Sequence, residues 1–226
     1  MMRIGNFAFP PQRTTVQATT IEAKSKVRKE IRLRALLIDD LSDVHAERIA
    51  QLRAEIERFD RDQAAFSQHP GRYYTGRQRR VLIHSHPRKP LTWVDLTLLT
   101  HDRFERSQAL HQTGGETDEG ARTLHVWNRG NWPSPFTLIL EAHSEIESLN
   151  AALGDETFTF GQAMQAGQTL VLDTEEPSVW LDQANAFAGG NQVFPQLAPG
   201  ENSVEITLAP ATAQAQCTLQ FRDFWI

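Results

Sequence analysis

The feature that most constrains the fold is a series of short strand-like segments in the second half of the chain. Seven segments show alternating or short continuous apolar residues, with turn residues between them. They are 122–128, 136–143, 156–161, 168–174, 178–183, 203–208 and 215–221. About seven short antiparallel strands over roughly 110 residues are typical of a β-sandwich. Turns are predicted at 153–155, 165–167 and 198–202, where glycine, proline and acidic or amide residues gather.

The first half predicts strands and one long helix. Residues 24–37 alternate between a largely basic row and an apolar row, which is the period of a half-buried strand. The polar row is Lys24, Lys26, Arg28, Glu30, Arg32 and Arg34, and the apolar row is Val27, Ile31, Leu33, Ala35 and Leu37. A further strand is predicted over 91–100, with Val94, Leu96 and Leu98 on one face.

The helix is predicted over about 43–66. Ser42 is placed to act as its N-cap. One apolar stripe recurs at helical spacing and consists of Ile49, Leu52, Ile56, Phe59 and Phe66. Such a stripe favours packing on a sheet, and the alternative is a coiled-coil partner. The fold class is therefore mainly β: an N-terminal β-domain with one packed helix, followed by an antiparallel sandwich.

A change of composition divides the chain near residues 112–120, Gln-Thr-Gly-Gly-Glu-Thr-Asp-Glu-Gly. Small, polar and acidic residues predict a flexible connection there, which gives domains 1–111 and 112–226. The charge changes at the same place. Residues 1–110 carry 20 Lys and Arg against 13 Asp and Glu, a net +7, and residues 111–226 carry 3 against 15, a net −12. Such asymmetry is a signal of separate domains.

Several classes of protein are excluded. No run of residues approaches the roughly 20 apolar positions of a membrane-spanning helix, and the first residues lack the apolar core of a signal peptide. The single cysteine, Cys217, rules out an internal disulfide and cysteine-based zinc sites. Its alternation with Leu219 and Phe221 predicts a buried thiol.

Motifs for catalysis are missing from the sequence. It has no phosphate-binding glycine loop, no Gly-x-Ser-x-Gly and no His-Glu-x-x-His. His84 and His86 share one face of a strand, but no third ligand lies near them in the sequence. The acids Asp173, Glu175 and Glu176 are expected to be solvated turn residues rather than a hydrolytic pair. We therefore predict no catalytic residues, no metal and no cofactor.

Three kinds of candidate binding residue remain. The basic row is a solvated face or a contact with an acidic partner or neighbouring subunit, and Lys26, Arg28, Arg32 and Arg34 are its candidates. Trp127, Trp132 and Trp180 could stack on sugar rings, or they could be core residues. Arginines around Tyr73 and Tyr74 are compatible with nucleic-acid binding, although the acidic second half would repel phosphate.

Residues 169–208 resemble the distal tail protein family of siphophages. The resemblance lies in Asp173-Thr174 at a strand end and in a Phe-Pro-x-Leu-x-Pro-Gly-x-Asn motif. That motif consists of Phe194, Pro195, Leu197, Pro199, Gly200 and Asn202. The stretches 126–140, 70–77 and 91–107 are also similar to the family. We assign the motif a role in folding, because Pro199 and Gly200 suit a tight turn that feeds the strand 203–208.

The resemblance implies a structural protein of the phage tail tip. The family's N-terminal domain forms a ring, usually of six subunits, that continues the tail tube and leaves a channel through which DNA passes. The family's C-terminal domain is a galectin-like sandwich on which tail-hub and receptor-binding proteins dock. The implied location is the virion, after synthesis in the bacterial cytoplasm and without membrane insertion. The alternatives left open by the residues are a carbohydrate-binding module and a glycan hydrolase.

Overall fold

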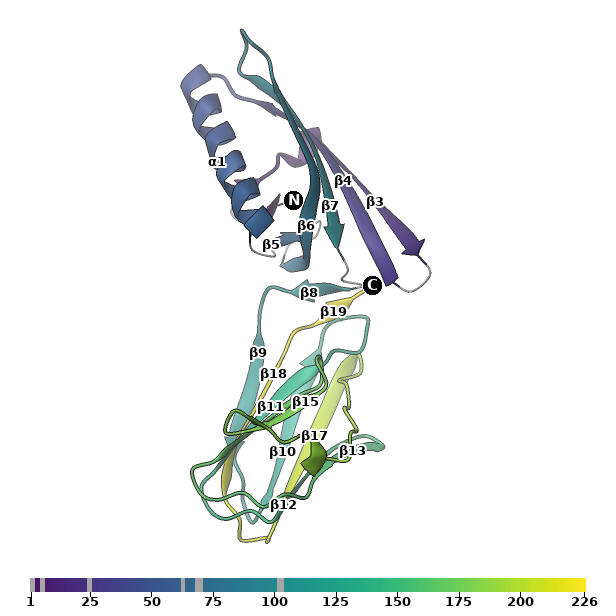
Figure 1. Ribbon diagram of the computed structural model, residues 1–226, viewed down its shortest axis with the longest axis vertical. Coiled ribbons are helices and arrows are strands. Elements are labelled where there is room, and N and C mark those ends of the chain that lie inside the picture. Colours follow the sequence, from purple (N-terminus) through teal and green to yellow (C-terminus); the bar gives the residue numbers. More distant parts are fainter. Residues whose placement is uncertain (1–2, 5–6, 24–25, 62–63, 68–70, 101–103) are drawn as a thin grey trace. The chain divides into compact units, whose positions relative to one another are not determined.

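The computed structural model describes residues 3–4, 7–23, 26–61, 64–67, 71–100 and 104–226. The chain divides into unit 1, Met1–Gln108 with Ile226, and unit 2, Ala109–Trp225 (Figure 1). Strands dominate both units, and all the strand pairs of each unit are antiparallel. The predicted mainly β fold class is confirmed. No helix among the described residues is both long and apolar enough to cross a bilayer.

Unit 1 is built on one antiparallel sheet with a helix on one face. The strand order is β2-β1-β5-β6-β7-β4-β3, and β8 pairs with β6. The bounds are β1 Arg3–Ile4, β2 Phe7–Ala8, β3 Thr14–Ala23, β4 Lys26–Ile38, β5 Ala64–Ser67, β6 Arg72–Ser85, β7 Leu91–Thr100 and β8 Glu105–Ser107. A short 3-10 helix, η1, spans Pro11–Arg13. The strands β6, β7 and β4 lie next to one another in the sheet.

The alternation of β4 places its apolar row in the core. Ile31, Leu33, Ala35 and Leu37 are buried, as predicted, together with Val94, Leu96 and Leu98 of β7. Arg32 and Arg34 lie on the opposite, exposed face. Glu30 departs from the pattern, because it lies on the polar row but is buried. Its carboxylate accepts a hydrogen bond from Nε of Arg32 at 2.8 Å.

Helix α1, Ser42–Arg61, packs on the sheet (Figure 1). Ile49, Leu52 and Ile56 pack in one core cluster with the buried residues of β4 and β7. The apolar stripe of the helix therefore packs on the sheet, as predicted, and not on a coiled-coil partner. The predicted end of the helix was wrong. Residues 64–67 form β5, which pairs with both β1 and β6. Phe66 thus belongs to a strand, and Ser42 is the first helical residue instead of the N-cap.

Unit 2 is a sandwich of two antiparallel sheets. One has the order β10-β17-β12-β13, and the other has the order β16-β15-β14-β11-β18-β9. The bounds are β9 His111–Glu116, β10 Ala121–Asn128, β11 Phe136–Ala142, β12 Ser148–Leu153, β13 Glu156–Phe160, β14 Thr169–Asp173, β15 Ser178–Leu181, β16 Ala184–Asn185, β17 Gly200–Ala209, β18 Ala215–Phe221 and β19 Phe224–Trp225. A 3-10 helix, η2, spans Phe187–Gly189. All seven predicted strands are present, whereas β9, β12, β16 and β19 were missed.

The predicted flexible connection over 112–120 was wrong in its first half. Residues 111–116 form β9, which pairs along its whole length with β18. The glycines permit a close approach there. A Cβ on Gly114 would lie 2.5 Å from the carbonyl oxygen of Cys217, and a Cβ on Gly115 would lie 2.5 Å from the guanidinium of Arg122. A segment whose composition is typical of a linker therefore forms an edge strand.

The core of unit 2 is formed by the inward residues of both sheets. Its largest fully buried side chains are Phe136, Phe158 and Phe160. Cys217 is fully buried among them, as the alternation predicted. Burial raises the pKa of the Cys217 thiol to about 11, so the thiolate is scarce at neutral pH and the side chain acts as an apolar core residue.

Candidate functional site

Two of the predicted interface residues, Arg32 and Arg34, lie on the sheet face of unit 1 that is opposite α1. Arg32 and Arg34 are exposed on β4, and Nε of Arg34 donates to Oδ2 of Asp95 on β7 at 3.2 Å. The side chains of Lys26 and Arg28 lie outside the described residues, although both residues belong to β4. Two of the four candidates are therefore placed, and they share one face.

A tryptophan on the same face was missed by the sequence analysis. Trp93 lies two residues before Asp95 on β7, and the two residues project to the same side of the sheet. Trp93 is 53% exposed, and Ile38 at the end of β4 is 36% exposed. We call the set Arg32, Arg34, Trp93 and Asp95 the outer face. Because side chains alternate along a strand, the predicted burial of Val94, Leu96 and Leu98 implies that Trp93 projects to the opposite face. This alternation could have identified Trp93 from the sequence.

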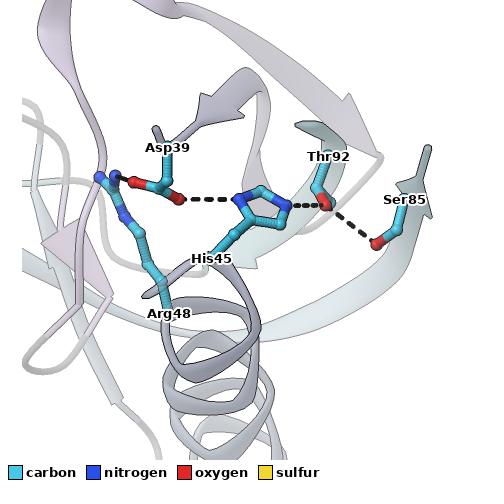
Figure 2. Close-up of polar contacts among 5 residues, drawn as sticks. All are labelled: Asp39, His45, Arg48, Ser85 and Thr92. Carbon is cyan, nitrogen blue, oxygen red and sulfur yellow. Dashed lines mark hydrogen bonds and ion pairs between the residues drawn. The ribbon is translucent and has the colours of Figure 1, made fainter. Parts of the chain in front are cut away.

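A buried polar network joins α1 to the sheet on the other side of unit 1 (Figure 2). His45, in the first turn of α1, contacts Oδ2 of Asp39 through Nδ1 at 2.7 Å, and its Nε2 contacts Oγ1 of Thr92 at 2.7 Å. Arg48 donates from Nη1 to Oδ1 of Asp39 at 2.8 Å. The hydroxyl of Ser85 lies 2.9 Å from that of Thr92. Three elements, β4, α1 and the β6–β7 hairpin, are thereby tied together.

This network resembles the aspartate-histidine-hydroxyl order of a catalytic triad, but its geometry serves packing. Because a carboxylate can only accept, Nδ1 of His45 is the donor to Asp39. The hydroxyl that contacts Nε2 belongs to Thr92, which is fully buried and is therefore out of reach of a substrate. A groove of about 710 Å³ lies beside the network, between α1 and residues 85–90. His45 and Ser85 line it, so the network holds one of its walls.

Acidification is expected to weaken unit 1 through Asp39. Burial alone would raise the pKa of this carboxyl, but hydrogen bonds from His45 and Arg48 and their charges hold it below the usual value. A carboxyl with a lowered folded-state pKa contributes stability that is complete above its unfolded pKa of about 3.9 and is lost as the pH falls through the folded value. We therefore expect the urea midpoint of unit 1, followed by hydrogen exchange of the amides in α1 and β7, to fall as the pH decreases below about 4.

The Asp39→Asn variant tests this assignment, because asparagine does not titrate. Its urea midpoint should change less over the same pH range than that of the unsubstituted protein. Asp40→Asn, at the exposed neighbouring position, is the control and should keep the full pH dependence. An unchanged pH dependence in Asp39→Asn would contradict the assignment.

The two histidines of the His-x-His pair do not form a metal site with other described residues. His84 and His86 are both exposed, and Nδ1 of His86 accepts a hydrogen bond from the backbone N–H of Arg88 at 3.1 Å. Within the described part of the chain, no group of three His, Cys, Asp or Glu side chains is placed to hold a metal ion.

The motif residues of unit 2 lie along one loop and its anchor. Asn128 is buried and donates from Nδ2 to the carbonyls of Trp132 and Leu197, each at 3.0 Å. Asn202 donates from Nδ2 to the carbonyls of Ala198 and Gly200 at 2.8 Å and 3.0 Å. Gly200 has φ +98°, which a side chain would strain. The Asn128 region and the Phe194–Asn202 motif, far apart in the sequence, therefore meet in one hydrogen-bonded unit.

The remaining motif residues support this loop. Leu197 and Pro195 are buried, and the ring of Phe194 stacks on that of Phe187 with centroids 5.7 Å apart. Asp173 stands at the end of β14, where its Oδ1 accepts from the backbone N–H groups of Glu175 and Glu176 at 2.8 Å and 3.2 Å. These contacts shape turns and bring no carboxylate pair across a cleft.

The three candidate tryptophans occupy different places. Trp127 is 61% exposed on β10, and Trp180 is 41% exposed on β15 of the other sheet. Trp132 is half-buried and forms a bridge with Phe224 of β19. They cannot line one groove, because Trp127 and Trp180 belong to opposite sheets of the sandwich.

Comparison with known proteins assigns unit 2 to a family. Residues 129–225 match the family model SPP1_Dit, described as siphovirus-type tail component, C-terminal domain. These residues belong to the siphovirus-type tail component family. A solved structure, the Dit protein (gp 19.1) of phage SPP1, covers 100% of this chain and 92% of its own, with a TM-score of 0.60 and 13% sequence identity. No curated protein sequence matches the chain.

The family assignment and the fold confirm the resemblance drawn from the sequence. The matched region 129–225 of this chain includes the Phe194–Asn202 motif, and the similarity to the SPP1 Dit fold extends through both units. Unit 2 is thus similar to a structural component of the siphovirus tail, and the fold of both units is similar to that of the SPP1 Dit protein. The SPP1 protein itself is described as a paradigm of hub adsorption apparatus in phages that infect Gram-positive bacteria.

Proposed function

We propose that this tail component forms a ring, a hexamer, that joins the tail tube to the tail-tip and receptor-binding proteins. Unit 1 makes the ring contacts, and the channel of the ring lets phage DNA pass. Unit 2 provides the surface on which tail-hub and receptor-binding proteins dock. The assembled protein is located at the tip of the phage tail, after synthesis in the host cytoplasm. The observation that carries the proposal is the Dit-like fold over both units together with the tail component family of unit 2.

The outer face supports self-association. Tryptophan and arginine are enriched where proteins contact one another. The outer face has Trp93 as the apolar anchor and Arg32, Arg34 and Asp95 as charged neighbours. A ring is closed by a heterologous contact repeated by rotation, which joins this face to a different surface of the next subunit.

Charge reversal on the outer face tests the ring. Arg32→Glu with Arg34→Glu places two acids beside Asp95, so we expect assembly to weaken by about tenfold or more, equivalent to about 1.4 kcal/mol. Sizing chromatography with light scattering measures the subunit number, and negative-stain microscopy shows the symmetry of the particles. Trp93→Ser should reduce assembly as well, because it removes the apolar anchor.

Arg53→Glu with Arg58→Glu is the matched control. Both residues are exposed on α1, away from the outer face, and the change in net charge is the same. Assembly should be unaffected in this control. Unchanged assembly in the Arg32 and Arg34 variant would exclude the outer face as a ring contact. Particles that lack rotational symmetry under all conditions would refute the ring itself.

A further inference from the structure

The four-stranded sheet of unit 2 presents an outward surface with a tryptophan beside polar side chains. Trp127 of β10 lies directly across from Glu201 of β17, and His125 lies across from Ser203. Glu205, two residues further along β17, projects to the same side. We call the set Trp127, His125, Glu201, Ser203 and Glu205 the Trp127 face. Cross-strand neighbours of this kind have Cβ atoms about 5 Å apart, so the indole and the Glu201 carboxylate are adjacent.

A hollow of about 490 Å³ opens beside this surface on the β12 side of β17, and Trp127 does not line it but lies directly across from one of its lining residues, Glu201. Glu201, Ser203 and Glu205 line one side, and the β12–β13 turn at Leu153 and Gly154 lines the other. The loop residues Gln196 and Ala198 close a third side. Asn202 fixes that loop through its bond to the carbonyl of Ala198, so the hollow has a defined wall. The space suits one or two sugar rings better than a whole protein element.

The polar groups of the hollow are available for hydrogen bonds. Within the described residues, the carboxylates of Glu201 and Glu205 have no ion pair or hydrogen bond, and neither does the side-chain amide of Gln196. Ser203 and His125 contact each other at 3.0 Å between Oγ and Nδ1, which orients the hydroxyl and leaves Nε2 outward. Two free carboxylates accept hydrogen bonds from hydroxyl groups and repel anions.

We propose that the Trp127 face binds a neutral oligosaccharide. The C–H side of a pyranose ring is apolar and packs on the exposed indole of Trp127, while ring hydroxyls donate to Glu201 and Glu205. An anionic glycan is excluded by these two carboxylates and by the net −12 of the second half of the chain. The site lies on unit 2 alone, so it is independent of whether unit 1 forms a ring.

The structure separates Trp127 from the other two tryptophan candidates. Trp180 is also exposed, but its cross-strand neighbours are Val171 and Asn185, which supply no carboxylate. Trp132 is half-buried against the chain end at Phe224. Trp180 is therefore a matched control: an exposed tryptophan on the same unit, on the opposite sheet, with no acid directly across from it.

The test uses the full chain and defined glycans. An array of neutral and anionic oligosaccharides identifies bound structures, and isothermal titration then gives the Kd of the strongest neutral ligand. We expect a Kd in the range of about 0.1–1 mM, as is usual for a shallow site. Trp127→Ala and Glu201→Gln should each weaken binding by about tenfold or more. Trp180→Ala should leave the Kd unchanged. Isolated host cell-wall polysaccharide, tested beside the soluble ligand, shows whether the sugar is recognised on the cell surface.

Three results would overturn the proposal. One is that no neutral glycan binds at about 1 mM, or that only anionic glycans bind. Another is that Trp127→Ala binds as tightly as the unsubstituted protein. The third is that Trp180→Ala loses binding as Trp127→Ala does. If Trp127→Ala fails to fold, as judged by circular dichroism, Glu201→Gln decides alone, because it preserves the size of the side chain.

Discussion

Replacing Gly130 with alanine is expected to reduce the free energy of unfolding of unit 2 by about 3 kcal/mol. A Cβ at this position would overlap the carbonyl oxygen of Phe224 and lie 2.8 Å from its backbone nitrogen. Backbone cannot move aside as a flexible side chain can, so the strand end at Phe224 must shift. That carbonyl also accepts hydrogen bonds from the N–H groups of Asn131 and Trp132, at 3.1 Å and 3.2 Å. The shift would weaken these bonds as well.

Further contacts would be strained by the same shift. Asp223, next to Phe224, is buried and accepts from the N–H of Arg129 at 2.9 Å, and its other oxygen contacts Nε2 of His111 at 2.8 Å. Asn128 accepts from the N–H of Gly130 at 2.8 Å while it holds Leu197 of the family motif. The glycine therefore allows the last residues of unit 2 to lie against the segment that anchors the motif loop.

Urea denaturation followed by tryptophan fluorescence measures this effect, because Trp127, Trp132, Trp180 and Trp225 all lie in unit 2. Gly161→Ala is the matched control. A Cβ on Gly161 would meet no atom within 4 Å, and its φ is not in the left-handed region. We expect a change of less than about 0.5 kcal/mol there. Equal stability of the Gly130 and Gly161 variants would show that Phe224 can move without cost.

Replacing Asp39 with alanine is expected to reduce the free energy of unfolding of unit 1 by about 3 kcal/mol. Asp39 accepts from both His45 and Arg48, and its side chain is nearly buried. Without the carboxylate, Arg48 loses its ion pair, and Nδ1 of the nearly buried His45 loses its acceptor in a place that water reaches poorly. A buried donor without an acceptor costs more than the bond itself contributes. The first turn of α1 would therefore loosen from the β6–β7 hairpin.

Hydrogen exchange of amides in α1 and β7 reports on unit 1 directly. Exchange in both elements should accelerate in Asp39→Ala at neutral pH, whereas amides of β11 and β18 in unit 2 provide an internal reference. Asp40→Ala is the control, because Asp40 is the exposed neighbour of Asp39, and we expect less than about 0.5 kcal/mol there. Similar exchange in the two variants would show that the network of Figure 2 contributes little to the stability of unit 1.

Two features of unit 1, the buried His45 and the strand β5, could not be predicted from the sequence. His45 lies in a polar stretch at the start of the helix, and no pattern indicated that it is buried. Its burial depends on Thr92, 47 residues away, whose hydroxyl fills the remaining hydrogen-bonding position of the ring. In the same way, β5 was assigned to the helix because Phe66 continues the helical spacing of the apolar stripe, seven residues after Phe59. Pairing with β1 and β6 outweighs that local preference.

The sequence by itself determined which residues form most strands, which face of β4 and β7 is buried, and that Cys217 lies in the core. Those properties depend on the alternation of consecutive side chains, which is a local consequence of the pleat. It also carried the Phe194–Asn202 motif that linked the chain to its family. Only the tertiary structure decided which side chains meet: Arg34 with Asp95, Asn128 with Leu197, and Trp127 with Glu201. Such pairs depend on strand order and register, and these are set by the combined packing of segments distant in the sequence.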